Sequence, residues 1–194
     1  MADIRQTVLN VLASPTARRI DFHLGSINVD AAGLAAIHNL VAVNAIPVKV
    51  VGMDSGVAAQ YRNDTNGLEF PRDTYGANAK ERSDILHECI HALHDMYGGG
   101  TWFPQKGGSK FTPRSENEAA AYVADALFYT YETGGGAQGH GDPIFDLAAM
   151  IAKRIMNKPG SFVTVQEARA LRIAIVSDST YRYRYDTLTV ADGP

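Results

Sequence analysis

The chain has 194 residues, of which 45% are hydrophobic and 20% charged, and its formal net charge is −3. This balance is typical of a folded globular protein and excludes a disordered chain. The 18 basic residues form no long run, so no nucleic-acid or membrane partner is expected. The single cysteine, Cys89, excludes an internal disulfide and is expected to pack as a small apolar residue.

The N-terminal region, residues 1–20, contains no apolar core of signal-peptide length. It predicts a short helix that Pro15 terminates, with one apolar face: Val8, Leu9, Val11 and Leu12. No segment of the chain has the apolar run needed to span a bilayer. We therefore expect a cytoplasmic protein, or one exported without a cleavable signal peptide.

Turn, cap and periodicity signals predict the remaining elements. In chain order these are a helix at 30–45 with Asp30 as N-cap, a strand at 46–52, a hairpin of 56–62 and 68–70 turning at Asn66-Gly67, helices at 83–97, 115–132, 142–156 and 164–176, the last capped by Thr164, and a strand at about 179–190. The pattern predicts an α+β fold, with a small mixed sheet and an antiparallel edge hairpin followed by a mainly helical C-terminal half. We expect one domain over 1–194, with a core at about 46–132 and a C-terminal helical part at about 142–190.

The segment "LHECIHALHD", residues 86–95, contains three histidines in a predicted helix. At about 100° per residue, His87, His91 and His94 share one stripe, while the apolar residues cover the opposite side. A solvated helix face usually carries lysine, arginine and glutamate. Three imidazoles on one stripe therefore need another explanation.

Zinc binding explains two of these histidines. His87 and His91 are four residues apart, so both rings can reach one metal ion, and neutral imidazole suits zinc. Glu88 lies on the flank of the pair, where it can act as general base on a water held by the ion. His94 is about 10 Å along the helix axis from His87, at ~1.5 Å per residue, which is too far for the same ion. It is assigned to the surroundings of the site, the substrate cleft or the last turn of the helix.

The best candidate for a third ligand is Glu118, 27 residues after His91 and followed by three alanines that permit close helix packing. Glu116 is the rival. Ser115-x-x-Glu118 also fits a capping box, in which Glu118 would bond back to the backbone of Ser115. Both roles would be compatible if Thr112 capped the helix instead, with Pro113 as its first residue.

The pattern His87-Glu88-x-x-His91 followed by Asn117-Glu118-Ala119 resembles the gluzincin metallopeptidases, whose third ligand is a glutamate on the next helix. The run 118–124 is similar to the ExANxFA pattern of the IrrE/ImmA-like peptidases, although Ala120 replaces their frequent asparagine. Small bacterial effector metallopeptidases share this minimal core. The resemblance covers about residues 56–130.

The resemblance implies a zincin-like core, with an edge strand above the metal that pairs with the substrate backbone. "GVAAQYR" (56–62) or "LEF" (68–70) is the expected strand. It also implies an oxyanion donor from the C-terminal part, for which four candidates stay unranked: His140, Tyr181, Tyr183 and Tyr185. A carboxylate should orient the histidines through their second ring nitrogen, and Asp125 is a candidate; the alternative is an aspartate on a solvated helix face.

We therefore expect a zinc-dependent endopeptidase that acts on a protein or peptide substrate. Metal ligands are His87, His91 and Glu118, and the general base is Glu88. The alternatives are a catalytically silent binding or sensor protein on a metallopeptidase fold, and a structural domain with surface histidines. The sequence predicts no oligomeric state.

Overall fold

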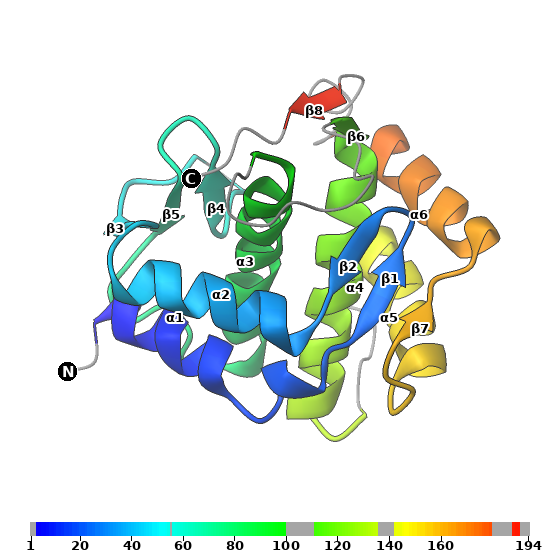
Figure 1. Cartoon of the computed structure of the whole chain (residues 1–194), viewed down its shortest axis with the longest axis horizontal. Helices are drawn as coiled ribbons and strands as arrows, with labels where there is room; N and C mark the ends of the chain where they lie inside the picture. Colours follow the sequence, from blue (N-terminus) through cyan, green and yellow to red (C-terminus); the bar gives the residue numbers. More distant parts are fainter. Residues whose placement is uncertain (1–2, 55, 100–110, 136–141, 180–187, 191–194) are drawn as a thin grey trace.

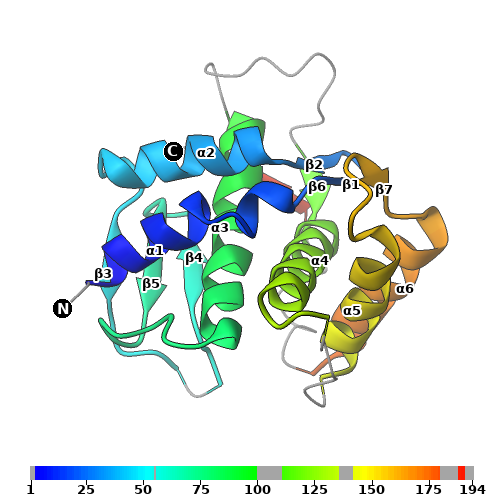
Figure 2. The same ribbon diagram turned by 90° about the horizontal axis from the view of Figure 1, so that it is seen from below.

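The computed structural model describes residues 3–54, 56–99, 111–135, 142–179 and 188–190. Within these ranges the chain is a mixed α+β structure with small sheets and a mainly helical C-terminal half, which confirms the predicted class. The helices after the strands of residues 48–70 are α3 (Ala79–Gly99), α4 (Arg114–Glu132), α5 (Pro143–Ile155) and α6 (Val165–Ser177). Helices α3 and α4 lie side by side at the centre, and α5 and α6 pack on the far side of α4 (Figure 1, Figure 2).

Two N-terminal helices, α1 (Ile4–Ala13) and α2 (Ala31–Ala42), pack against each other and against α3. A 3-10 turn, η1 (Ala17–Arg19), lies between them. The side chain of Asp30 accepts a 2.7 Å hydrogen bond from the Gly33 N–H, which confirms the predicted N-cap. Helix α2 ends at Ala42, before the predicted residue 45, and Asn44 follows its end with a positive φ of 62°.

The predicted hairpin forms from β4 (Gln60–Arg62) and β5 (Gly67–Phe70), and the predicted strand before it forms as β3 (Val48–Val50). The sheet order is β3-β5-β4, with β5 parallel to β3 and antiparallel to β4. Asn66 takes up the turn with a φ of 46°, while Gly67 already belongs to β5. Strand β4 is thus an edge strand, and it lies next to α3.

Sequence reasoning missed a second small sheet, of order β2-β1-β7, formed by β1 (Phe22–Leu24), β2 (Ile27–Val29) and β7 (Ser161–Phe162). Strands β1 and β2 pair as an antiparallel hairpin, and β7 adds parallel to β1. A sequence signal was present: two apolar-polar-apolar triplets, 22–24 and 27–29, flank Gly25, which takes a φ of 57° in the structure. This hairpin turn lies beside the start of α4, where the Ser26 N–H bonds to Glu116.

The boundaries of α3 and α4 differ from the prediction. Helix α3 starts four residues early because Asn78 Oδ1 accepts a 3.0 Å hydrogen bond from the Glu81 N–H. Helix α4 follows directly on β6 (Phe111–Pro113), which pairs antiparallel with β8 (Leu188–Val190). The alternative start of this helix, with Thr112 as cap and Pro113 as first helical residue, is therefore wrong, because both residues belong to β6. Of the strand predicted at 179–190, only β8 and residue 179 lie within the described residues.

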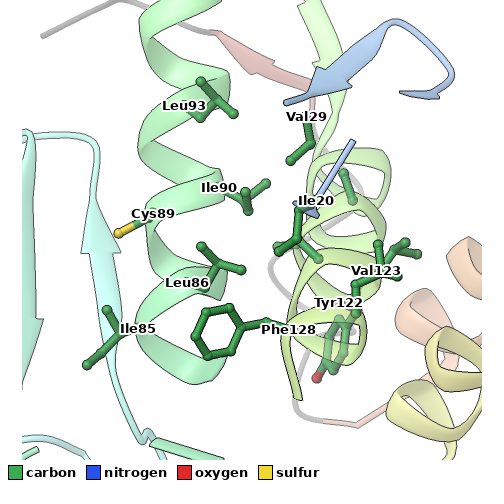
Figure 3. Packing of buried hydrophobic residues seen from close by; sticks show 14 of the residues in the cluster. Ile20, Val29, Ile85, Leu86, Cys89, Ile90, Leu93, Tyr122, Val123 and Phe128 are labelled. Carbon is green, nitrogen blue, oxygen red and sulfur yellow. The ribbon is translucent and has the colours of Figure 1, made fainter. Parts of the chain in front are cut away.

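The centre of the core is the contact between α3 and α4 (Figure 3). Leu86 and Ile90 of α3 point toward α4, and Phe128 of α4 points back toward α3; all three side chains are fully buried. Cys89 is also fully buried, on the side of α3 that faces the sheet, so its predicted apolar packing is confirmed. None of the described helices is both long and apolar enough to cross a membrane.

Candidate metal centre

Helix α3 carries His87 and His91 one turn apart, with their ring centroids 4.9 Å from each other. The apolar face of α3 is fixed against α4 and the sheet, so the ionisable stripe is directed to one side of that contact. His87 is 9% exposed and His91 is half-buried. Both imidazoles are therefore held in the wall of a cleft and are not free on the surface.

Helix α4 brings Glu118 to the same place. Its Oε1 lies 3.2 Å from His87 Nε2, and its Oε2 lies 3.4 Å from His91 Nε2. Glu118 is 3% exposed, so its carboxylate has lost most of its contact with water. One donor atom from each of the three residues lies within 4.8 Å of the other two, and the trio could hold a metal ion.

The donor set fits a divalent ion such as zinc. Ligands about 2.1 Å from a tetrahedral ion lie about 3.4 Å apart, which is close to the two observed nitrogen–oxygen distances. Two imidazoles and one carboxylate are donors that zinc accepts in open sites with a remaining position for water. The three residues therefore need little movement to bind one ion together.

Glu116, the rival third ligand, does not join this group. Its Oε1 accepts a 3.3 Å hydrogen bond from the Ser26 N–H in the β1–β2 turn, and its Oε2 lies 3.7 Å from Arg172. Residues two positions apart on a helix differ by about 200° in direction, so Glu116 and Glu118 face opposite ways. The rival assignment is therefore wrong.

The capping-box interpretation of Ser115 is also wrong. Helix α4 begins at Arg114, so Ser115 lies inside the first turn and is not the N-cap. Its hydroxyl accepts a 3.1 Å hydrogen bond from Arg172 Nε. The carboxylate of Glu118 instead lies beside the two imidazoles.

Each histidine has a partner behind its ring. The Nδ1 of His91 lies 3.1 Å from Asn117 Oδ1, and because an amide oxygen only accepts, the ring donates its Nδ1–H. That tautomer leaves the lone pair on Nε2, the atom that faces Glu118. The Nδ1 of His87 lies 3.9 Å from Oδ2 of Asp125, which is longer than a hydrogen bond and makes the contact electrostatic.

Asp125 lies where the sequence predicted an orienting carboxylate. It is 2% exposed, and Lys80 of α3 approaches its Oδ2 at 3.8 Å. Burial raises the pKa of Asp125 above its ordinary value, although Lys80 and His87 oppose the shift. Burial alone would lower the pKa of His87, but its contact with Glu118 outweighs this and raises it.

The proposed base, Glu88, is held by the edge strand. Its Oε2 accepts a 2.7 Å hydrogen bond from the backbone N–H of Tyr61 in β4. The N–H of Tyr61 therefore points away from β5, toward α3. The hydroxyl of Tyr61 in turn donates a 2.7 Å hydrogen bond to the fully buried Asp95 of α3, which fixes β4 to the helix at a second point.

The three candidate ligands, Glu88 and Asp125 line one cleft of about 680 Å³. Residues 56–61 form one wall, and the start of α5 with Asp142 and Phe145 contributes to another. The ring of Tyr122 meets His87 edge-on at 5.0 Å between centroids and also lines the cleft. All four predicted oxyanion donors lie outside the described residues: His140, Tyr181, Tyr183 and Tyr185.

Comparison of the chain with family models, with curated proteins and with solved structures gave no match. The assignment of this site therefore depends on its own geometry and chemistry. Sequence reasoning missed two members of the site, Asn117 and the Tyr61 amide. Asn117 directly precedes Glu118, and the run Asn117-Glu118-Ala119 was the available sequence signal for it. The Tyr61 contact had no sequence signal, because a backbone N–H does not depend on the residue type.

Proposed function

We propose that the protein is a zinc-dependent peptidase of the gluzincin type. His87, His91 and Glu118 hold the ion, and Glu88 is the general base. The observation that carries the proposal is the convergence of three donor atoms within 4.8 Å from two separate helices. The next observation in its support is that the glutamate after the first histidine lines the same cleft and contacts the edge strand.

The donors agree with zinc in number and type. Three protein ligands leave one position open, as in catalytic zinc sites, whereas structural sites close all four positions with protein donors. The orienting contacts of Asn117 and Asp125 also favour a metal site, because ligating histidines usually direct their second nitrogen to a carbonyl or carboxylate. A buried ion pair alone would not need both imidazoles directed at one carboxylate.

When bound, zinc supplies Lewis acidity, which lowers the pKa of a coordinated water from about 15.7 toward roughly 7 and polarises the scissile carbonyl. Glu88 accepts the proton of the attacking water and passes it to the leaving amine. Its Oε2 is engaged by Tyr61, and its Oε1 accepts no hydrogen bond from a described residue, so Oε1 is the proton-accepting atom. Such a base typically contributes on the order of 10² to 10⁴ in rate.

The substrate is a peptide in extended conformation. Strand β4 is an edge strand beside the site, and residues 56–61 line the cleft, so a peptide can add to the strand by main-chain hydrogen bonds. A zincin-like minimal core is part of this proposal. It is supported by the packing of α3 against α4 and by the edge strand β4, which lies next to α3.

The test combines metal analysis with a substrate screen. Protein purified without a histidine tag should contain about one zinc ion per chain, the number expected for one three-ligand site. The zinc-loaded protein should cleave members of a broad peptide library, as detected by mass spectrometry, and chelation should stop the cleavage. Absence of bound metal would reject the site. Zinc without cleavage would favour a silent binding protein instead of a peptidase.

A further inference from the structure

The third histidine of the stripe belongs to a line of side chains behind the metal site. The Nδ1 of His91 lies 3.1 Å from Asn117 Oδ1, and the Nδ2 of Asn117 lies 3.3 Å from His94 Nδ1. We propose that His94 is a positioning residue, which fixes the orientation of the Asn117 amide and thereby presents Nε2 of His91 to the metal. This inference rests on the metal site of the proposed function but not on its peptidase activity.

The hydrogen bonds from His91 through Asn117 to His94 can run in only two directions. The side-chain amide of Asn117 has one end that accepts and one that donates. With Oδ1 toward His91, the His91 ring carries its proton on Nδ1 and its lone pair on Nε2. With the amide reversed, Nδ2 would donate to Nδ1 of His91, and the proton would move to Nε2, where it would block metal binding.

His94 selects the first arrangement because its Nδ1 accepts the N–H of Asn117. An acceptor at this point requires a neutral ring with its proton on Nε2, and burial lowers the pKa of His94 to about 4, which keeps the ring neutral. Asn117 is only 7% exposed, so water cannot readily replace the imidazole as its acceptor. A buried N–H without an acceptor costs about 1–3 kcal/mol, which is enough to bias the amide strongly.

The geometry also explains why His94 is on the stripe without being a ligand. His94 lies three residues after His91, and it approaches Asn117 from the opposite side of the amide. Within the described residues, the group that could hold an ion contains His87, His91 and Glu118 but not His94. The same helix face thus supplies two donors to the ion and one acceptor to the residue that orients a donor.

The experiment compares the zinc affinity of His94→Leu and His94→Asn, measured by competition with a chromophoric chelator. Asparagine places Oδ1 where histidine has Nδ1, so it keeps the acceptor, whereas leucine fills the space without one. His94→Leu should bind zinc about tenfold more weakly, at the low end of the 10–100-fold typical for orienting partners. His94→Asn should stay within about threefold of the wild type, because its Oδ1 accepts the same hydrogen bond.

A spectroscopic measurement and a control accompany the affinities. The visible absorption of the Co²⁺-loaded protein reports ligand geometry, and it should change in His94→Leu but not in His94→Asn. His23→Leu is the control, since it removes another half-buried imidazole from the β1 strand, where it stacks on Phe162. Thermal unfolding of the metal-free proteins shows whether each variant is folded.

A double-mutant cycle with Asn117→Ala completes the test. If His94 acts through Asn117, adding His94→Leu to Asn117→Ala should weaken zinc binding no further. Equal affinity of the wild type and His94→Leu would overturn the inference, as would additive losses in the cycle. A wild-type protein that binds no zinc would instead reject the proposed metal site itself, and a zinc-binding protein without peptidase activity would leave the positioning role intact.

Discussion

The backbone N–H of Tyr61 donates a 2.7 Å hydrogen bond to Oε2 of Glu88, and this contact joins the edge strand to the helix that carries the paired histidines. The contact fixes the direction of the carboxylate within the cleft. It also places the proposed base at the strand that a substrate would extend. The first prediction follows from this geometry.

Replacing Glu88 with glutamine should abolish peptide cleavage and retain zinc. Glutamine keeps an oxygen that can accept the Tyr61 N–H, so the local structure should persist, but it cannot take up a proton. We expect the rate to fall by about 10² to 10⁴, the usual contribution of a general base. Zinc content and peptide cleavage measured on the same preparation provide the check. Full activity with zinc bound would rule out Glu88 as the base.

Replacing Glu118 with glutamine should remove most of the zinc affinity, because the ion loses its anionic ligand. The loss should exceed the roughly 10–100-fold that follows removal of an orienting partner. Glu116→Gln is the matched control, since it makes the same change two residues away, at a side chain bonded to Ser26. Competition with a chelator measures both affinities. Equal losses in the two variants would contradict the ligand assignment.

Replacing Asp125 with asparagine should weaken zinc binding while the protein stays folded. Asp125 lies 3.9 Å from Nδ1 of His87 and stabilises the proton on that atom by charge. Since the contact is electrostatic, we expect about a tenfold loss of affinity. Asp146→Asn, on the exposed side of α5, should leave the affinity unchanged. An Asp125→Asn protein with wild-type affinity would show that His87 is oriented by other contacts.

The contacts of Glu81 at the start of α3 should make the stability of the folded protein depend on pH. Glu81 accepts hydrogen bonds from the N–H groups of Gly76 at 2.8 Å and Ala77 at 3.1 Å, and it pairs with Arg72. Burial alone would raise the pKa of Glu81, but these contacts outweigh it and hold the pKa below its ordinary value of 4.5. Its stabilising contribution is therefore present above pH 4.5 and is lost as the pH falls through the lowered pKa.

Glu81→Gln should accordingly reduce the free energy of unfolding by about 1–2 kcal/mol at pH 7. The difference from the wild type should shrink as the pH is lowered below 4.5, where the wild-type carboxylate becomes protonated. Urea denaturation at a series of pH values measures both. Asp73→Asn, at an exposed residue nearby, serves as the control. A difference that does not vary with pH would show that the charge of Glu81 is irrelevant to stability.

The sequence alone determined the local features of this protein. The spacing of His87 and His91, the segregation of apolar residues on α3 and the caps at Asp30 and Thr164 are set within one or two helical turns. Such features depend on helix periodicity and on side chains that reach the neighbouring backbone. They are therefore readable without knowledge of the fold.

Only the tertiary structure decided between Glu118 and Glu116. The choice depends on which face of α4 meets α3, and the partner of Glu116 is a hairpin turn that the sequence analysis did not predict. The contact of Tyr61 with Glu88 and the line from His91 through Asn117 to His94 are likewise contacts between separate elements. Their existence is fixed by how the buried faces of β4, α3 and α4 pack together, because that packing sets the direction of every side chain at their margin.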